Sequence, residues 1–160
     1  MGDKRRFDLF ASYIEARVPK DARIADVAAG KGYLSFALLR KGFKHVTPFE
    51  PEPRRGGQVT RLGMHVLNFT SEHAQEFDVI VGMHPDAATD HILDGCARFG
   101  LHGIVVPCCI KPSAWTYLHN KSSHAQWESH LREQSRQRGL QVFGDKLKMV
   151  GANSVIEVKP

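Results

Sequence analysis

The sequence predicts an α/β fold: a seven-stranded, mostly parallel sheet with a C-terminal antiparallel hairpin and helices on both faces. After an opening helix, short apolar runs alternate with segments of helical periodicity, which is typical of β-α units in a parallel sheet. The last two apolar runs follow one another directly, so we expect them to pair as a hairpin. The length of 160 residues indicates one domain, spanning 1–160.

The first elements follow from local periodicity and from the residues that end them. An amphipathic helix is expected over 5–17, because its apolar residues recur at helical spacing and Pro19 ends it. The apolar run at 23–28 predicts a short buried strand. A second helix is expected over 33–42, with Gly42 placed where a left-handed cap is favoured.

Four further apolar runs, at 45–50, 64–69, 77–83 and 103–109, predict the second to fifth strands. Between the last two, one apolar face at helical spacing predicts a helix over 87–100. The segments on either side of the third strand are too short for long helices. We therefore expect a shortened version of the parent α/β fold.

The end of the chain combines one polar helix with the closing hairpin. The helix is expected over 123–138 and ends before Gly139. The hairpin strands are expected within 140–150 and 153–160, which brings the total to seven strands.

Composition places few limits on function. Apolar residues make up 42% of the chain and charged residues 24%, as in an ordinary soluble globular protein. The net charge of +5 is compatible with a polyanionic partner. A modestly basic protein that binds no polyanion can have the same charge. Cys96, Cys108 and Cys109 are odd in number and two are adjacent, so we expect no disulfide framework and a cytoplasmic location. We recognise neither a signal peptide nor a membrane span.

The stretch 24–50 contains the strongest functional signal. Gly30 and Gly32 form a small-residue turn between the first strand and the next helix, where backbone can approach a ligand and adopt positive φ. Glu50 ends the second strand, where a carboxylate can accept both hydroxyls of a ribose. Asp26, before the turn, disfavours a pyrophosphate and favours a cationic ligand. S-adenosyl-L-methionine (SAM) has a ribose, a sulfonium and an ammonium group, and no phosphate.

Three motifs resemble those of the class I SAM-dependent methyltransferases. "ADVAAGKG" is similar to their first motif, D-x-G-x-G-x-G, with Ala28 in place of the first glycine; "VTPFEPEPR" resembles the second and "FDVIVGMHPD" the fourth. The resemblance spans about 23–110 and implies a Rossmann-like fold with SAM as cofactor. The third motif is blurred, with Asn68 or Ser71 nearest to its acid. The implied cofactor-binding residues are Asp26, Ala28, Gly30, Gly32, Glu50, Asn68 and His84.

The loops after the fourth and fifth strands hold the candidate catalytic residues. Asp86 could accept a proton or hold the acceptor group, or it could cap the following helix. His84 is expected to position the acceptor by a hydrogen bond or to act as a base. Cys108 and Cys109 resemble the nucleophile position of RNA cytosine-C5 methyltransferases, although cysteines there can also be pocket walls.

Substrate contacts are expected from basic and aromatic side chains. Arg54 and Arg55 follow Glu50 on the ligand side, Lys111 follows the fifth strand, and Trp115 could stack on a base or belong to a lid or core. Arg61, Arg132, Arg136, Arg138 and Tyr117 are further candidates. His119, His124 and His130 do not share a helical face, so no metal site is expected.

These observations lead to three alternatives. The first is a SAM-dependent methyltransferase that acts on RNA, such as tRNA or rRNA. The second is a small-molecule methyltransferase with 115–127 as its lid. The third is a non-catalytic SAM-fold module. Within the domain we expect an N-terminal helix at 1–20, a cofactor-binding half at 21–110, and a substrate-side loop, helix and hairpin at 111–160.

Overall fold

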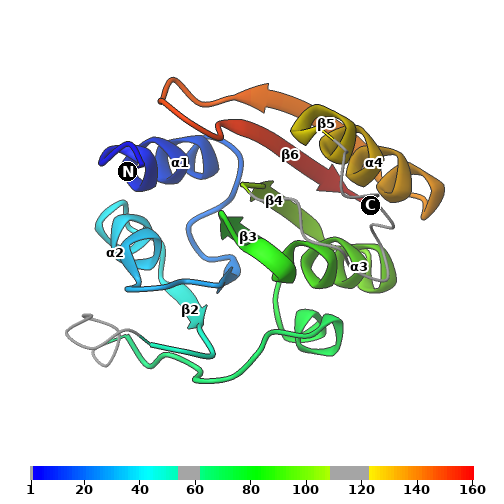
Figure 1. The fold of residues 1–160 in the computed structure, drawn as a ribbon. Helices are drawn as coiled ribbons and strands as arrows, with labels where there is room; N and C mark the ends of the chain where they lie inside the picture. Colours follow the sequence, from blue (N-terminus) through cyan, green and yellow to red (C-terminus); the bar gives the residue numbers. More distant parts are fainter. Residues whose placement is uncertain (1, 54–61, 109–122) are drawn as a thin grey trace.

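The computed structural model describes residues 2–53, 62–108 and 123–160. After the opening helix, strands and helices alternate as the sequence predicts (Figure 1). The helices are α1 (Arg6–Glu15), α2 (Tyr33–Arg40), α3 (Thr89–Phe99) and α4 (His124–Gln137), with short 3₁₀ helices η2 (Ser71–Glu76) and η3 (Asp86–Ala88). The strands are β1 (Arg23–Val27), β2 (His45–Phe49), β3 (Val79–Met83), β4 (His102–Val106), β5 (Gln141–Lys146) and β6 (Ser154–Lys159).

The described strands form one mixed sheet in the order β2-β1-β3-β4-β6-β5. The first four are parallel to one another, whereas β6 is antiparallel to both β4 and β5. The chain moves outward from β1 to β2 and then returns to β3 on the other side of β1. The strand order therefore reverses between β1 and β3, where open α/β sheets place their ligands.

The prediction of a strand at 64–69 is wrong, and the described sheet has six strands rather than seven. His65 forms a single parallel bridge with Phe49 at the edge of the sheet. The chain then turns away, because the Leu67 N–H donates to the carbonyl of His65. Val66 stays 61% exposed, so the apolar run does not bury the face that would hold a strand there. Within 64–69 only Phe69 is buried, with its ring edge-on to Phe49.

Helices cover both faces of the sheet, as predicted (Figure 1). α1 and α2 pack on one face, through residues such as Ile14 and Leu38, against Ile24 and its neighbours. α3 and α4 pack on the other face, where Trp127 and alternate strand residues form a second core. The inner strands are apolar on both sides because both faces are covered. Among the described helices, none is long and apolar enough to cross a bilayer.

Candidate active site

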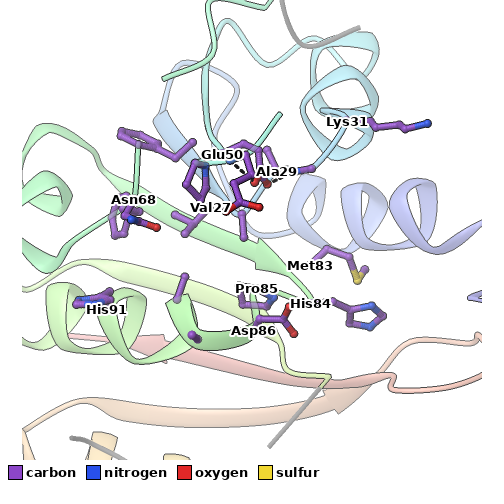
Figure 2. A pocket seen from close by; sticks show the side chains of 18 of the residues that line it. Val27, Ala29, Lys31, Glu50, Asn68, Met83, His84, Pro85, Asp86 and His91 are labelled. Atoms are coloured by element: carbon purple, nitrogen blue, oxygen red, sulfur yellow. Dashed lines mark hydrogen bonds between the residues drawn. The ribbon is translucent and has the colours of Figure 1, made fainter. Parts of the chain in front are cut away.

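A pocket of about 850 Å³ lies at the carboxyl ends of β1, β2 and β3, where the strand order reverses. Its size is that of a small-molecule or cofactor site. Glu50 and Asp86 lie on opposite sides, with Asn68 and His91 toward one end and Met83 and His84 toward the other (Figure 2). The lining residues are Arg6, Phe7, 27–31, Tyr33, 49–52, 68–70, 83–88 and His91.

The turn after β1 has the left-handed backbone that its glycines predict. Gly30 has a φ of 57° and Gly32, at the N-terminus of α2, has a φ of 78°. Ala28 also has a positive φ, 57°, which is strained for a residue with a side chain. This is the position at which the sequence has alanine in place of the first motif glycine. The turn thus keeps its shape at the expense of local strain.

Glu50 joins the end of β2 to this turn. Its Oε2 accepts a hydrogen bond from the Gly30 N–H at 2.8 Å, and its Oε1 accepts one from the Glu52 N–H at 3.0 Å. Each carboxylate oxygen has two lone pairs, so both can accept a further bond from a ligand. Glu50 is half-buried, lines the pocket, and is held in place by the backbone on both sides.

Asp26 lies beneath the turn and does not line the pocket. It is 1% exposed, and its Oδ2 accepts a hydrogen bond from Ser35 Oγ at 2.6 Å. Burial raises its pKa to about 7, and the nearby charge of Glu50 adds to this, while hydrogen bonds from Ser35 lower it. Asp26 would therefore influence a cationic ligand through its charge and through its hydrogen bond to Ser35 of α2, and not by direct contact.

The loop after β3 holds two residues with left-handed backbone, His84 with a φ of 56° and Asp86 with a φ of 51°. The imidazole Nε2 of His84 lies 2.9 Å from the carbonyl oxygen of Ala152, which can only accept, so Nε2 donates. Burial lowers the pKa of His84, and the charge of Arg6 acts in the same direction. The ring is thus held neutral with its lone pair on Nδ1, which leaves both predicted roles open.

The structure brings together two of the three predicted catalytic residues. Cys108, just after β4, donates from Sγ to Oδ1 of Asp86 at 3.2 Å. Neither η3 nor α3 has a side-chain cap hydrogen bond, so the alternative that Asp86 caps the helix is wrong. A thiolate facing a carboxylate at this distance is unfavourable, and Cys108 does not line the pocket. These contacts favour a supporting role for Cys108.

Comparisons with known proteins identify the fold. No family model matches the sequence, and no curated protein matches it. Solved methyltransferase structures superpose along almost the whole chain. The precorrin-6y C5,15-methyltransferase of Geobacter metallireducens has a TM-score of 0.61 at 12% identity, covering 95% of this chain and 87% of that protein. The chain has the class I SAM-dependent methyltransferase fold.

Two further structures share this fold with the chain. The 1,6-didemethyltoxoflavin-N1-methyltransferase of Burkholderia thailandensis was solved with bound 1,6-didemethyltoxoflavin and S-adenosylhomocysteine. It has a TM-score of 0.59 at 17% identity, and the match covers 98% of this chain and 78% of that protein. A SAM-dependent methyltransferase from Thermotoga maritima has a TM-score of 0.55 at 17% identity, with coverage of 97% and 90%.

Within this methyltransferase fold, most of the predicted site residues that the structure describes meet at one pocket. Ala28, Gly30, Glu50, Asn68, His84 and Asp86 line it. Gly32 begins α2 beside it, and Asp26 and Cys108 lie behind it. The predicted substrate contacts Arg54, Arg55, Lys111 and Trp115, together with Cys109, Arg61, Tyr117 and His119, lie outside the described residues. In the described ranges, no cluster of three metal-ligating side chains is found.

Several lining residues were not predicted. Arg6 and Phe7 reach the pocket from α1, and His91 reaches it from α3. Tyr33 follows the glycine turn directly, so its position along the chain could have indicated it. No local signal marks Arg6 or Phe7, because their place at the pocket depends on how α1 packs beside α2.

Proposed function

We propose that this chain is a SAM-dependent methyltransferase that uses the pocket at the ends of β1 and β3. The observation on which the proposal rests is the fixed position of Glu50, which accepts the N–H of Gly30 at 2.8 Å and faces the pocket. A carboxylate with spare lone pairs beside a left-handed glycine turn suits a ribose and a close backbone approach. The methyltransferase fold supports the same cofactor.

The pocket residues fit the parts of SAM. Glu50 would accept the ribose hydroxyls, and the turn at Gly30 leaves open space beside its Cα, with no atom within 4 Å of an added Cβ. Asn68 and His91, at one end, would contact the adenine. The opposite end, near Met83 and His84, would receive the methionine portion (Figure 2). When bound, SAM supplies an electrophilic methyl group on a sulfonium.

The loop after β3 would handle the acceptor group. His84 is neutral with its lone pair on Nδ1, and Asp86 faces Glu50 across the pocket (Figure 2). Either can hydrogen-bond the acceptor and take its proton, and methyl transfer itself depends mainly on alignment of the acceptor. Cys108 would keep Asp86 in place through its hydrogen bond.

For the acceptor, we propose RNA, such as tRNA or rRNA. The support is the net charge of +5 and the basic side chains Lys4, Arg6 and Arg40 near the pocket. A small-molecule acceptor is the second candidate, favoured by the small-molecule substrate named for the Burkholderia relative in fold. A chain that binds SAM but transfers no methyl group would be the non-catalytic module.

Calorimetry with SAM and S-adenosylhomocysteine tests the central proposal. We expect both to bind, and Glu50→Ala to weaken them by about 1–3 kcal/mol through loss of charge-assisted hydrogen bonds. Glu76→Ala, at an exposed glutamate on η2, is the matched control and should change nothing. Absence of binding to the wild-type chain would refute the proposal. Labelled SAM incubated with fractionated RNA and with a small-metabolite extract then distinguishes the two acceptor classes.

A further inference from the structure

A second cavity, of about 620 Å³, lies between α1 and α2 beside the first pocket. Arg6, Phe7 and Tyr33 line both cavities and therefore form the wall between them. Gly2, Lys4, Asp8, Phe36 and Arg40 line the second cavity and not the first. The charge of Arg6 acts on the pKa of His84, so the shared wall lies near the pocket end that we assign to the methionine portion of SAM, and a ligand in the second cavity would adjoin the methyl group.

Aromatic rings form one side of this cavity. The rings of Phe7 and Tyr33 lie with centroids 5.5 Å apart and planes tilted by 45°. Tyr33 is 48% exposed, although a ring of this size on a helix is usually packed against the core. Phe36, one helical turn further along α2, continues the apolar surface. The exposed ring of Tyr33, beside the partly buried rings of Phe7 and Phe36, provides a stacking surface for a planar, aromatic ligand.

Positive charge surrounds the rings. Among the described residues that line the cavity, Lys4, Arg6 and Arg40 are basic and Asp8 is the one acid, which pairs with Arg40 at 2.9 Å. The guanidinium of Arg6 lies 4.6 Å from the centroid of the Phe7 ring, and its buried Nε has no hydrogen-bond partner among the residues that the structure describes. A buried N–H without an acceptor is unfavourable, so an anionic ligand oxygen would satisfy it.

We propose that the cavity between α1 and α2 binds a nucleotide, with the base against Phe7, Tyr33 and Phe36 and the phosphate at Lys4, Arg6 and Arg40. This inference rests on the proposed function, because it identifies the cavity as the site of the methyl acceptor. A flat aromatic group alone would not use the three cations, and a phosphate alone would not use the rings. The nucleotide can come from a free mononucleotide or from an RNA chain, because both present the same chemistry.

The test is calorimetry on the wild-type chain with and without saturating S-adenosylhomocysteine. The probes are the four ribonucleoside monophosphates, with uridine and inorganic phosphate for comparison. We expect at least one monophosphate to bind, at least about tenfold more tightly than uridine or phosphate, because only a monophosphate contacts both rings and cations. No saturable binding of any monophosphate in either condition would overturn the inference.

Three variants locate the binding. Phe36→Leu and Arg40→Gln change residues that line only the second cavity, and each should weaken the monophosphate at least about threefold. Asp8→Asn removes the one acid and should tighten binding by roughly threefold, which a merely structural role would not do. All three should leave the affinity for S-adenosylhomocysteine unchanged.

Matched controls lie far from the cavity. Phe143→Leu changes a ring that is 44% exposed on β5, and Arg136→Gln removes an exposed guanidinium on α4. Neither should alter monophosphate binding. If Phe36→Leu and Arg40→Gln behave like these controls, or if Asp8→Asn weakens binding, the nucleotide does not occupy this cavity and the inference is wrong.

The design separates failure of this inference from failure of the proposed function. S-adenosylhomocysteine that binds while no monophosphate does would refute the nucleotide site alone. Binding of a monophosphate without binding of S-adenosylhomocysteine would refute the SAM site and support the nucleotide site. A short single-stranded RNA identifies the source: much tighter binding than the monophosphate, with affinity falling steeply between about 50 and 200 mM salt, indicates RNA. Equal affinity with little dependence on salt indicates a free nucleotide.

Discussion

Glu50 accepts the backbone N–H of Gly30 at 2.8 Å, and this contact joins the end of β2 to the turn that follows β1. The two residues belong to different sequence motifs, and the sheet brings them together because β1 and β2 pair in parallel up to Val27 and Phe49. The carboxylate is thus oriented by the protein backbone itself. A preorganised acceptor of this kind loses little conformational entropy when a ligand binds.

Glu50→Gln should separate the structural role of Glu50 from its ligand role. Glutamine keeps one oxygen for the Gly30 N–H but places an amide N–H₂ near the Glu52 N–H, and it lacks the charge. We expect the melting temperature to stay near that of the wild type, while affinity for S-adenosylhomocysteine falls by about 1–3 kcal/mol. Thermal unfolding and calorimetry measure the two effects. Unchanged affinity would show that Glu50 serves only the turn.

Asp26 should make folding stability depend on pH. Burial raises its pKa to about 7, above the value of 3.8 expected in the unfolded chain. Its contribution to stability is therefore fully present below about pH 4 and is lost as pH rises through about 7. The loss should approach roughly 4 kcal/mol, and Asp26→Asn should abolish it.

Urea unfolding of the wild type and the variant at about pH 5 and pH 8 measures the part of this loss that falls between these values, about 2.5 kcal/mol. Asp21→Asn, at an exposed aspartate just before β1, is the control and should leave the pH dependence unchanged. If the free energies of unfolding of the wild type and Asp26→Asn differ by the same amount at both pH values, the expectation is contradicted.

His84 should be neutral at pH 7 with its proton on Nε2. Burial lowers its pKa below 6.5, and the hydrogen bond to the carbonyl of Ala152 places the proton. The NMR chemical shifts of the imidazole nitrogens report both the charge of the ring and the nitrogen that carries the proton. We expect the Nε2–H tautomer, titrating below pH 6.5. The contribution of this group to stability is then present above pH 6.5 and is lost as pH falls through the lower folded pKa. A proton on Nδ1 would contradict the assignment and remove His84 as a base.

Cys108 should form no covalent intermediate. Its thiol donates to Asp86, and a thiolate there would face a carboxylate at 3.2 Å. Incubation with SAM and RNA containing 5-fluorocytosine should give no adduct through Cys108 that survives denaturing electrophoresis, so any adduct of the wild type should persist in Cys108→Ser. An adduct present with the wild type and absent with Cys108→Ser would establish the nucleophile role instead.

Ala28→Gly should stabilise the fold slightly. The left-handed backbone at Ala28 costs about 1–2 kcal/mol for an L-residue, and glycine relieves it. The greater freedom of glycine in the unfolded chain offsets about 0.4–1 kcal/mol of this gain. Ala29→Gly is the control, because Ala29 is buried without a positive φ and should lose stability. Chemical unfolding compares the two; equal destabilisation would mean that the turn at Ala28 is unstrained.

Local sequence signals predicted most of the elements. The helix over 5–17 and the glycine turn depend on residues a few positions apart, and the structure confirms both, with α1 at Arg6–Glu15 and positive φ at Gly30 and Gly32. The prediction of a strand at 64–69 failed because an edge strand needs a neighbouring strand to pair with and a face that it can bury. Such requirements depend on tertiary packing, which an apolar run does not report.

The same distinction applies to the site. The sequence by itself determined the β-α order, the glycine turn and the acid at the end of the second strand, because these follow from short-range periodicity and backbone preference. Only the tertiary structure decided that Asp26 is buried against Ser35, that Cys108 bonds Asp86, and that the Phe7 ring packs on Tyr33. These contacts join segments distant along the chain, and only the packing of helices on the sheet brings them within reach.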